Sequence, residues 1–94
     1  MTAEKVREVT ALYRAKFAEL KLSPVRQPTD AEPGPTIARA LEHCYAMLDD
    51  LDRLTREGRM DKAFRWLGFV QGCLYACGIY RIAELKDHNK PSDA

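Results

Sequence analysis

Residues 66–80 read WLGFVQGCLYACGIY, and this stretch says most about how the chain folds. It has no charged side chain, although 31% of the residues in the chain are charged. Gly68, Gly72 and Ala76 recur every four residues, so on a helix they form one smooth strip. A glycine inside a helix costs about 1 kcal/mol relative to alanine, so two on one face indicate that another helix comes close there. Larger side chains surround the strip on its other sides: Trp66, Phe69, Leu74, Tyr75 and Tyr80.

A helix that is apolar nearly all round has to be covered on every side, which a chain of 94 residues hardly achieves alone. We therefore expect self-association into a dimer or a larger homo-oligomer. The predicted helix contacts are Gly68, Gly72, Ala76, Phe69 and Tyr75. The close neighbour of the strip is either the preceding helix of the same chain or the same stretch of a second copy.

The rest of the chain predicts an all-α protein with a single domain over residues 1–94. Apolar residues at helical spacing place an N-terminal amphipathic helix within 1–22. Four of the five prolines lie between residues 22 and 35, so 23–35 is expected to be an extended linker. Residues 36–90 are expected to form an antiparallel helical hairpin with a short C-terminal helix. Thr36 is suited to cap the first hairpin helix, and Gly58 to end it.

The two hairpin helices are expected to share a core of Leu41, Cys44, Leu48, Leu51, Leu67, Val70, Leu74 and Cys77. Cys44, Cys73 and Cys77, with His43 beside them, also raise the question of a metal site. His43 points about 100° away from Cys44 on a helix, and structural zinc ligands usually pair across tight turns. We therefore expect the cysteines to pack as small apolar groups, with no metal and no cofactor.

Charge and motifs argue against several classes of protein. The chain has 15 basic and 14 acidic residues, so its charge gives no general attraction to DNA or to an anionic membrane. The start lacks the apolar region of a signal peptide, and the apolar stretch is shorter than the 20 or so residues that span a bilayer. No nucleophile–base arrangement or phosphate-binding glycine loop is present. We expect a cytoplasmic, non-enzymatic protein.

One cluster of residues suits an anion or a nucleotide. Arg59, Lys62 and Arg65 fall in the first turns of the 60–77 helix and precede Trp66. A helix N-terminus attracts anions, and a flat aromatic ring can stack on a base. Tyr13, Arg14 and Arg26 are expected to join them from the N-terminal helix or the linker. The alternative is that the cations form a solvated helix face and that Trp66 packs in the core.

The block GRMDKAFRWLGFVQGCLYACGIYRIAELKDHNKP resembles a family of small proteins encoded by tailed phages and prophages, with the likeness covering about residues 36–91. The resemblance implies a helix, a glycine turn, an RWLGFVQG-type helix and an ELK-type ending. It implies no particular activity. In that family the last helix tends to open with Ser or Thr, where this chain has Arg81, so we expect its last helix to be less well capped.

The chain also has a weaker similarity to phage proteins that sequester cyclic signalling nucleotides, the anti-CBASS and anti-Thoeris sponges. These are oligomeric helical hairpins whose second helix carries an aromatic–Ala step, as Tyr75–Ala76 does here. The N-terminal nucleotide-contacting motif of the anti-CBASS type is absent. Three functions therefore stay open: binding of a host or phage protein, sequestration of a phosphorylated nucleotide, and a structural role in a virion.

Overall fold

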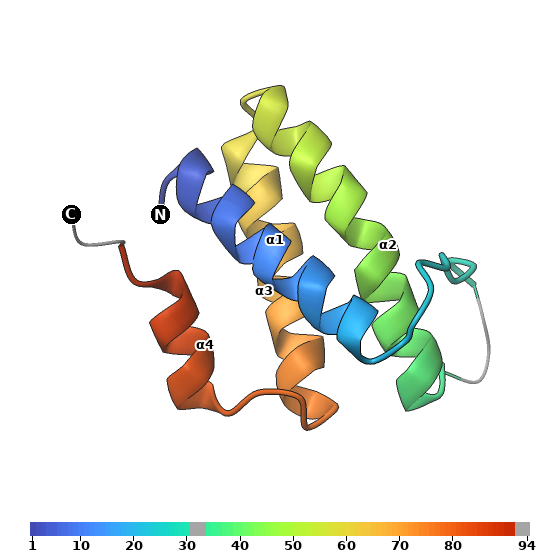
Figure 1. Cartoon of the computed structure of the whole chain (residues 1–94). Coiled ribbons are helices and arrows are strands. Elements are labelled where there is room, and N and C mark those ends of the chain that lie inside the picture. The colour runs from blue at the N-terminus through green and yellow to red at the C-terminus, as the bar shows by residue number, and fades with distance from the viewer. Residues whose placement is uncertain (31–33, 92–94) are drawn as a thin grey trace.

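The computed structural model of the chain describes residues 1–30 and 34–91 (Figure 1). Its helices are α1 (Ala3–Glu19), α2 (Ile37–Arg56), α3 (Met60–Ala76) and α4 (Ile82–Asn89). The described residues contain no strand, so the all-α prediction is confirmed for them. The Cα radius of gyration is 13.1 Å, close to the 12 to 13 Å or so of a compact domain of this length. No helix of the described part of the chain is long and apolar enough to cross a membrane.

The helices α2 and α3 lie side by side and run in opposite directions, and α1 lies beside α2 and crosses in front of α3 (Figure 1). Thr36 caps α2 by accepting a hydrogen bond from the Arg39 N–H, at 3.2 Å. Gly58 adopts a φ of 73° directly after α2, a left-handed conformation that favours glycine. This turn lets α3 fold back along α2.

The core lies between α1, α2 and α3. The first helix contributes Val6, Val9, Tyr13 and Phe17, which are at most 1% exposed. The second and third helices contribute all but one of the core residues expected from the sequence: Leu41, Cys44, Leu48, Leu51, Leu67, Val70 and Leu74. Cys77 differs, because it is the C-cap of α3 and is only half-buried.

The glycines of the strip do not approach α2 closely, so of the two neighbours that the sequence leaves open α2 is excluded, and a second copy stays a prediction. The side of α3 that packs against the core carries Ala63, Leu67, Val70 and Leu74. Gly68 and Gly72 are exposed, and a Cβ added to either would meet nothing within 4 Å. Spacing alone indicates that small residues share a face, but the larger aliphatic residues decide which face is buried.

Residues 25–27, between α1 and α2, are held against α2 by hydrogen bonds and an ion pair. Residues 22–30 and 34–36 contain no helix or strand. The Val25 N–H donates to the Glu42 carbonyl oxygen at 3.1 Å, and the Gln27 N–H donates to His43 Nδ1 at 2.9 Å. The Arg26 guanidinium is paired with the Asp50 carboxylate. Residues 25–27 therefore lie along α2, between Glu42 and Asp50.

The last helix, α4, has no fully buried residue; Leu85 is partly buried against the core, and polar groups make further contacts. The Gln71 and Asn89 amides exchange two hydrogen bonds, of 2.7 and 3.1 Å, and Tyr13 Oη lies 2.9 Å from His88 Nδ1. Arg81 makes no side-chain cap of the usual kind. Instead the Glu84 carboxylate accepts from the Arg81 N–H at 2.9 Å, and this bond is the main reason that the pKa of Glu84 is lowered.

Candidate functional site

The outer face of α3 is the side of that helix that the rest of the described chain leaves exposed, with Met1 and Asn89 beside it near Phe64 and Gly68. We define it by Phe64, Gly68, Phe69, Gly72, Tyr75 and Ala76, all of which are exposed. Phe69 is 53% exposed and Tyr75 is 52% exposed. Large apolar side chains left open on one helix face are typical of a surface that binds another protein.

The flatness of this face comes from its small residues. Gly68, Gly72 and Ala76 follow one another along the middle of the outer face, with Phe69 on one flank and Tyr75 on the other. The charged residues on this side, Asp61 and Arg65, lie toward the start of the helix. A second helix can approach the glycines more closely than the usual interaxial distance of about 8–10 Å.

The linker groove lies beside the outer face, between the linker, α2 and α3. It has a volume of about 510 Å³. Its lining residues are Arg26, Gln27, Thr29, His43, Met47, Arg65, Trp66 and Phe69. None of these side chains is acidic, and Met47, Trp66 and Phe69 are apolar or aromatic. Concave apolar sites with a few polar groups are where proteins bind small molecules.

A hydrogen bond from the linker determines which ring nitrogen of His43 can donate. Because His43 Nδ1 accepts the Gln27 N–H, a neutral imidazole must carry its proton on Nε2. The second ring nitrogen of His43 is therefore a hydrogen-bond donor. Together with the hydroxyl of Thr29 and the guanidinium of Arg65, it gives the groove donors around an apolar centre.

The cations around the groove differ in whether another side chain already contacts their charge. Arg26 is paired with Asp50, whose carboxylate also lies 3.5 Å from Arg53. Lys62 lies over the Trp66 ring, 5.5 Å from its centroid. Arg65 has no ion pair with any residue in the described ranges 1–30 and 34–91. Among these three cations, Arg65 is the one with neither an ion pair nor a cation–π contact, so its charge is the most available for a ligand.

The structure divides the predicted anion-binding residues into groups. Arg26, Arg65 and Trp66 come together in the linker groove. Arg59 and Lys62 line a second, shallower hollow of about 480 Å³ at the start of α3, which Arg65 also borders. Asp61 lies in that hollow and offsets its positive charge. The indole of Trp66 is half-buried against the core while it lines the groove.

Tyr13 and Arg14 do not join this site, and that expectation needs correction. Tyr13 is 0% exposed in the core. Arg14 bridges α1 to α2, with hydrogen bonds to Asp49 at 2.9 Å and Asp52 at 3.0 Å. Partial burial alone would lower the pKa of the Arg14 guanidinium, but the two carboxylates together raise it. Both side chains hold the fold together.

No local sequence pattern identifies the remaining groove residues. His43 and Met47 lie one turn apart on α2, a spacing that any amphipathic helix shows. Gln27 and Thr29 lie in a proline-rich segment whose path depends on tertiary hydrogen bonds. Phe69 was expected at a helix contact, and it borders both the outer face and the groove.

The three thiols belong to the core region between α2 and α3. Burial, and then the neighbouring Cys73 thiol, raises the pKa of Cys44 far above its ordinary value. Burial also raises the pKa of Cys77. Within residues 1–30 and 34–91, no group of three or more His, Cys, Asp or Glu side chains is arranged to hold a metal ion. Protonated thiols are weak nucleophiles and poor metal ligands.

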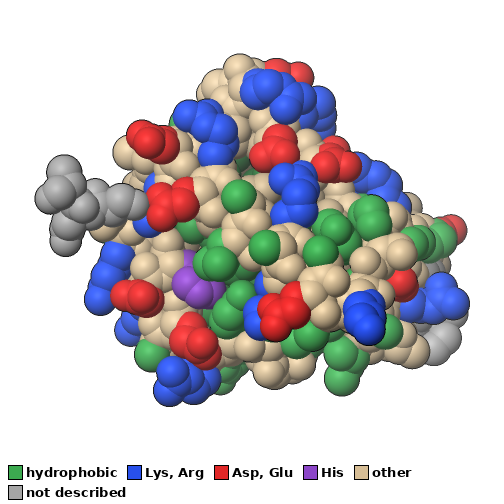
Figure 2. Space-filling view, in the orientation of Figure 1, with side chains coloured by type: hydrophobic (Ala, Val, Ile, Leu, Met, Phe, Trp, Pro, Cys, Tyr) green, Lys and Arg blue, Asp and Glu red, His purple; other side chains and the backbone are tan. Residues whose placement is uncertain are grey.

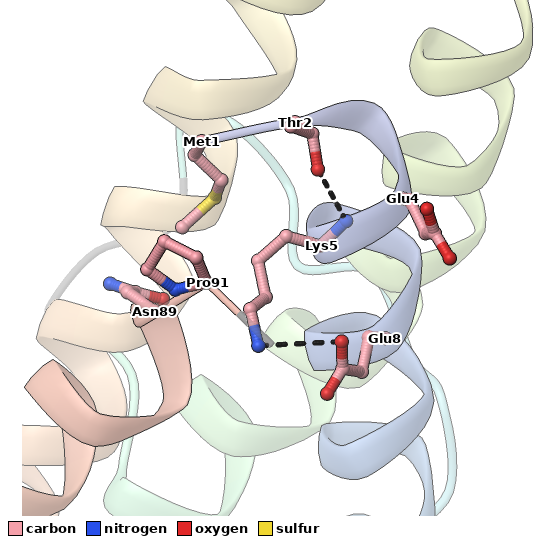
Figure 3. A pocket seen from close by; sticks show the side chains of 7 residues that line it. All are labelled: Met1, Thr2, Glu4, Lys5, Glu8, Asn89 and Pro91. Carbon is pink, nitrogen blue, oxygen red and sulfur yellow. Dashed lines mark hydrogen bonds and ion pairs between the residues drawn. The ribbon is translucent and has the colours of Figure 1, made fainter. Parts of the chain in front are cut away.

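Another hollow, of about 420 Å³, separates the start of α1 from the end of α4 (Figure 3). Lys5 and Glu8 form an ion pair of 3.3 Å on one side, and Asn89 and Pro91 lie on the other. Acidic and basic groups are mixed here, so the hollow has no charge preference. Charges of both signs are also mixed on the face of the molecule that Figure 2 shows, where acidic and basic side chains lie among hydrophobic ones.

Comparison of the chain with known protein families, with curated proteins and with solved structures finds no match in any of the three.

Proposed function

We propose that this chain is a small, non-catalytic protein of phage or prophage type that acts in the cytoplasm of a bacterial host. It self-associates through the outer face of α3, and the assembly binds a host or phage protein. The observation that carries the proposal is the outer face itself. Phe69 and Tyr75 are each more than half exposed, on either side of glycines that have open space above them. The phage origin and the protein partner rest on the resemblance of residues 36–91.

The outer face fits a second copy that runs in the opposite direction. On a helix, the residues three positions before and after Gly72 lie about 60° to either side of it, so Phe69 and Tyr75 flank the strip evenly. A two-fold axis at Gly72 would set Phe69 over the partner's Ala76, and Tyr75 over the partner's Gly68. Each aromatic ring then meets a small residue.

Charge supports the same pairing. The last turn of α3 has no basic residue, so the negative end of its dipole lacks a cation of its own. In the antiparallel pair, Arg65 of each copy lies near the C-terminal end of the partner's α3. The attraction between a cation and a helix C-terminus is worth about 0.3–1 kcal/mol.

The molecular mass of the purified protein tests this proposal. Sedimentation equilibrium of the wild type at tens of micromolar should give a dimer or a larger oligomer. Gly72→Leu should give a monomer that keeps its helical circular dichroism, because the added side chain has open space within one chain. Ala38→Leu is the matched control, since Ala38 is exposed on α2, and it should keep the wild-type mass.

Two results would count against self-association. One is a wild-type chain that stays monomeric at this concentration, which would leave the outer face to a different protein. The other is an oligomer whose mass Gly72→Leu does not change, which would place the contact elsewhere.

A second candidate function, sequestration of a phosphorylated cyclic nucleotide, has one observation in its favour. Arg26, Arg65 and Trp66, all expected at such a site, line one groove. Calorimetric titration with a cyclic dinucleotide tests it. Under this function the wild type binds and Arg65→Ala abolishes binding while the fold survives. Absence of binding by the wild type excludes the cyclic dinucleotide as the ligand.

A further inference from the structure

We propose that the linker groove binds a small aromatic anion: a flat apolar ring that carries one carboxylate, sulfonate or phosphate group. This inference goes beyond the proposed function and does not depend on whether the chain self-associates. It concerns a different surface, although Phe69 and Arg65 border both.

The size and the lining of the groove select the body of the ligand. Its volume of about 510 Å³ falls within the range of roughly 300–1,000 Å³ that is typical of small-molecule sites. Two aromatic side chains, Trp66 and Phe69, line it together with Met47, which is only 7% exposed. Aromatic rings pack well against a flat ring, and a methionine side chain adapts to its edge.

The polar groups select the charge of the ligand. The lining offers donors from Arg65, from Thr29 and from His43 Nε2, and it includes no carboxylate. A cationic ligand would meet Arg65 and the nearby Lys62 ammonium and would be repelled. An anion would form charge-assisted hydrogen bonds with the Arg65 guanidinium.

The number of available cations limits the number of charges on the ligand. The Arg26 guanidinium is already paired with Asp50, and Lys62 lies over the Trp66 ring. Of these three cations, Arg65 is the one that has neither an ion pair nor a cation–π contact among the described residues. One unpaired guanidinium matches one anionic group, so a compact ligand with a single charged group fits better than one with a chain of phosphates.

A matched pair of dyes tests this inference. Anilinonaphthalene sulfonate is a flat aromatic anion, and phenylnaphthylamine has a closely similar aromatic body without the charge. Trp66 is the only tryptophan of the chain, so quenching of its emission reports binding near the groove. We expect the sulfonate to quench Trp66 and to bind at least ten-fold more tightly than the neutral dye.

Substitutions then locate the dye. Arg65→Gln should weaken sulfonate binding about ten-fold or more, because a hydrogen bond to a charged group is lost. Arg59→Gln is the control. Arg59 borders the hollow at the start of α3 together with Arg65 but does not line the linker groove, so this substitution should change the affinity less than two-fold. Tyr75→Ala alters the outer face alone and should leave binding unchanged. Circular dichroism of each variant confirms that it is folded.

Three results would overturn the inference: equal affinity for the two dyes, wild-type affinity in Arg65→Gln, or loss of binding in Tyr75→Ala. The last would show that the dye coats the outer face of α3. Sedimentation of the same samples separates this test from that of self-association, because the groove lies within one chain and should bind dye whatever the mass.

Discussion

Tyr13 joins three helices at one hydroxyl group. Its ring is 0% exposed on α1. Its hydroxyl accepts a hydrogen bond of 3.0 Å from Gln71 Nε2 of α3 and lies 2.9 Å from His88 Nδ1 of α4. Burial raises the pKa of Tyr13 from 10.0 to about 12. The folded protein therefore favours the protonated phenol.

This raised pKa predicts a loss of stability in alkali. Between pH 10 and 12 the folded state holds the Tyr13 proton and the unfolded chain releases it, so the free energy of unfolding falls as the pH rises. A rise of about two units corresponds to roughly 2–3 kcal/mol over this interval. The contribution is fully present below pH 10.

Urea unfolding of the wild type and of Tyr13→Phe across this pH range measures the effect. The variant has no phenol to ionise, so its stability should fall less steeply, and other alkaline titrations cancel in the comparison. Parallel curves for the two proteins would show that Tyr13 does not carry the alkaline loss.

Thr10 presents the opposite situation in the same helix. It is 0% exposed, and its hydroxyl has no hydrogen-bond partner among the described residues. An unsatisfied buried polar group costs about 1–3 kcal/mol. Thr10→Val keeps the shape and removes the hydroxyl, so the free energy of unfolding should rise by about 1 kcal/mol.

The matched substitution is Thr55→Val on α2. Thr55 is also buried, but its hydroxyl donates to the Leu51 carbonyl oxygen at 2.6 Å. Its loss should lower the free energy of unfolding, by about 1 kcal/mol. Urea unfolding of both variants decides the question, and equal effects of the same sign would contradict this reading of Thr10.

At the scale of elements, α4 is the helix that opens most easily. It buries no residue completely and is held by the partly buried Leu85, the Gln71–Asn89 amide pair and the Tyr13–His88 contact. Native-state hydrogen exchange should therefore show lower protection in α4 than in α2, which buries eight residues. Asn89→Ala should lower the protection of α4 further, with little change in α2.

A control separates local opening from global instability. Lys86→Ala is an exposed change within α4 and should leave protection as in the wild type. If the amides of α4 and α2 exchange with the same free energy of opening, then the chain opens as one unit. That result would contradict the prediction that α4 opens separately.

The sequence predicted where the helices lie in the chain better than which side of each helix is buried. Regular spacing of apolar residues identified α2 and α3, and the glycine at 58 marked the turn between them. Spacing could not decide whether the glycine strip or the side with Leu67 and Val70 faces the core, because both fit a helical period. The structure resolves this through the larger aliphatic side chains, which bury more apolar surface.

Only the part of the candidate site that is local in the sequence could be predicted. Arg65 and Trp66 are neighbours in sequence, so any fold keeps them together. Tyr13 was misplaced although its spacing from Val6, Val9 and Phe17 already put it in the apolar stripe of α1. The groove itself depends on the bonds of Val25 and Gln27 to α2, and no local pattern encodes such bonds.

In the complete fold, the two sides of α3 have different surroundings. One side completes the core with α1 and α2, and the other is left open as the outer face. The visible face in Figure 2 mixes charges of both signs, consistent with the formal net charge of +1. The interactions that we propose therefore depend on the apolar surfaces and on Arg65 of the groove, and not on the overall charge.

The most direct test of the central claim is disulfide cross-linking across the outer face, in a background where Cys73 and Cys77 are replaced by serine. A disulfide needs Cα atoms within about 4.4–6.8 Å, so it reports close approach of the two helices. We predict that Gly72→Cys forms a covalent dimer, and that Gly68→Cys cross-links when mixed with Ala76→Cys but not with itself. Cross-linking of Gly68→Cys with itself would contradict the antiparallel pairing, and a chain that forms no cross-link and sediments as a monomer would contradict self-association through this face.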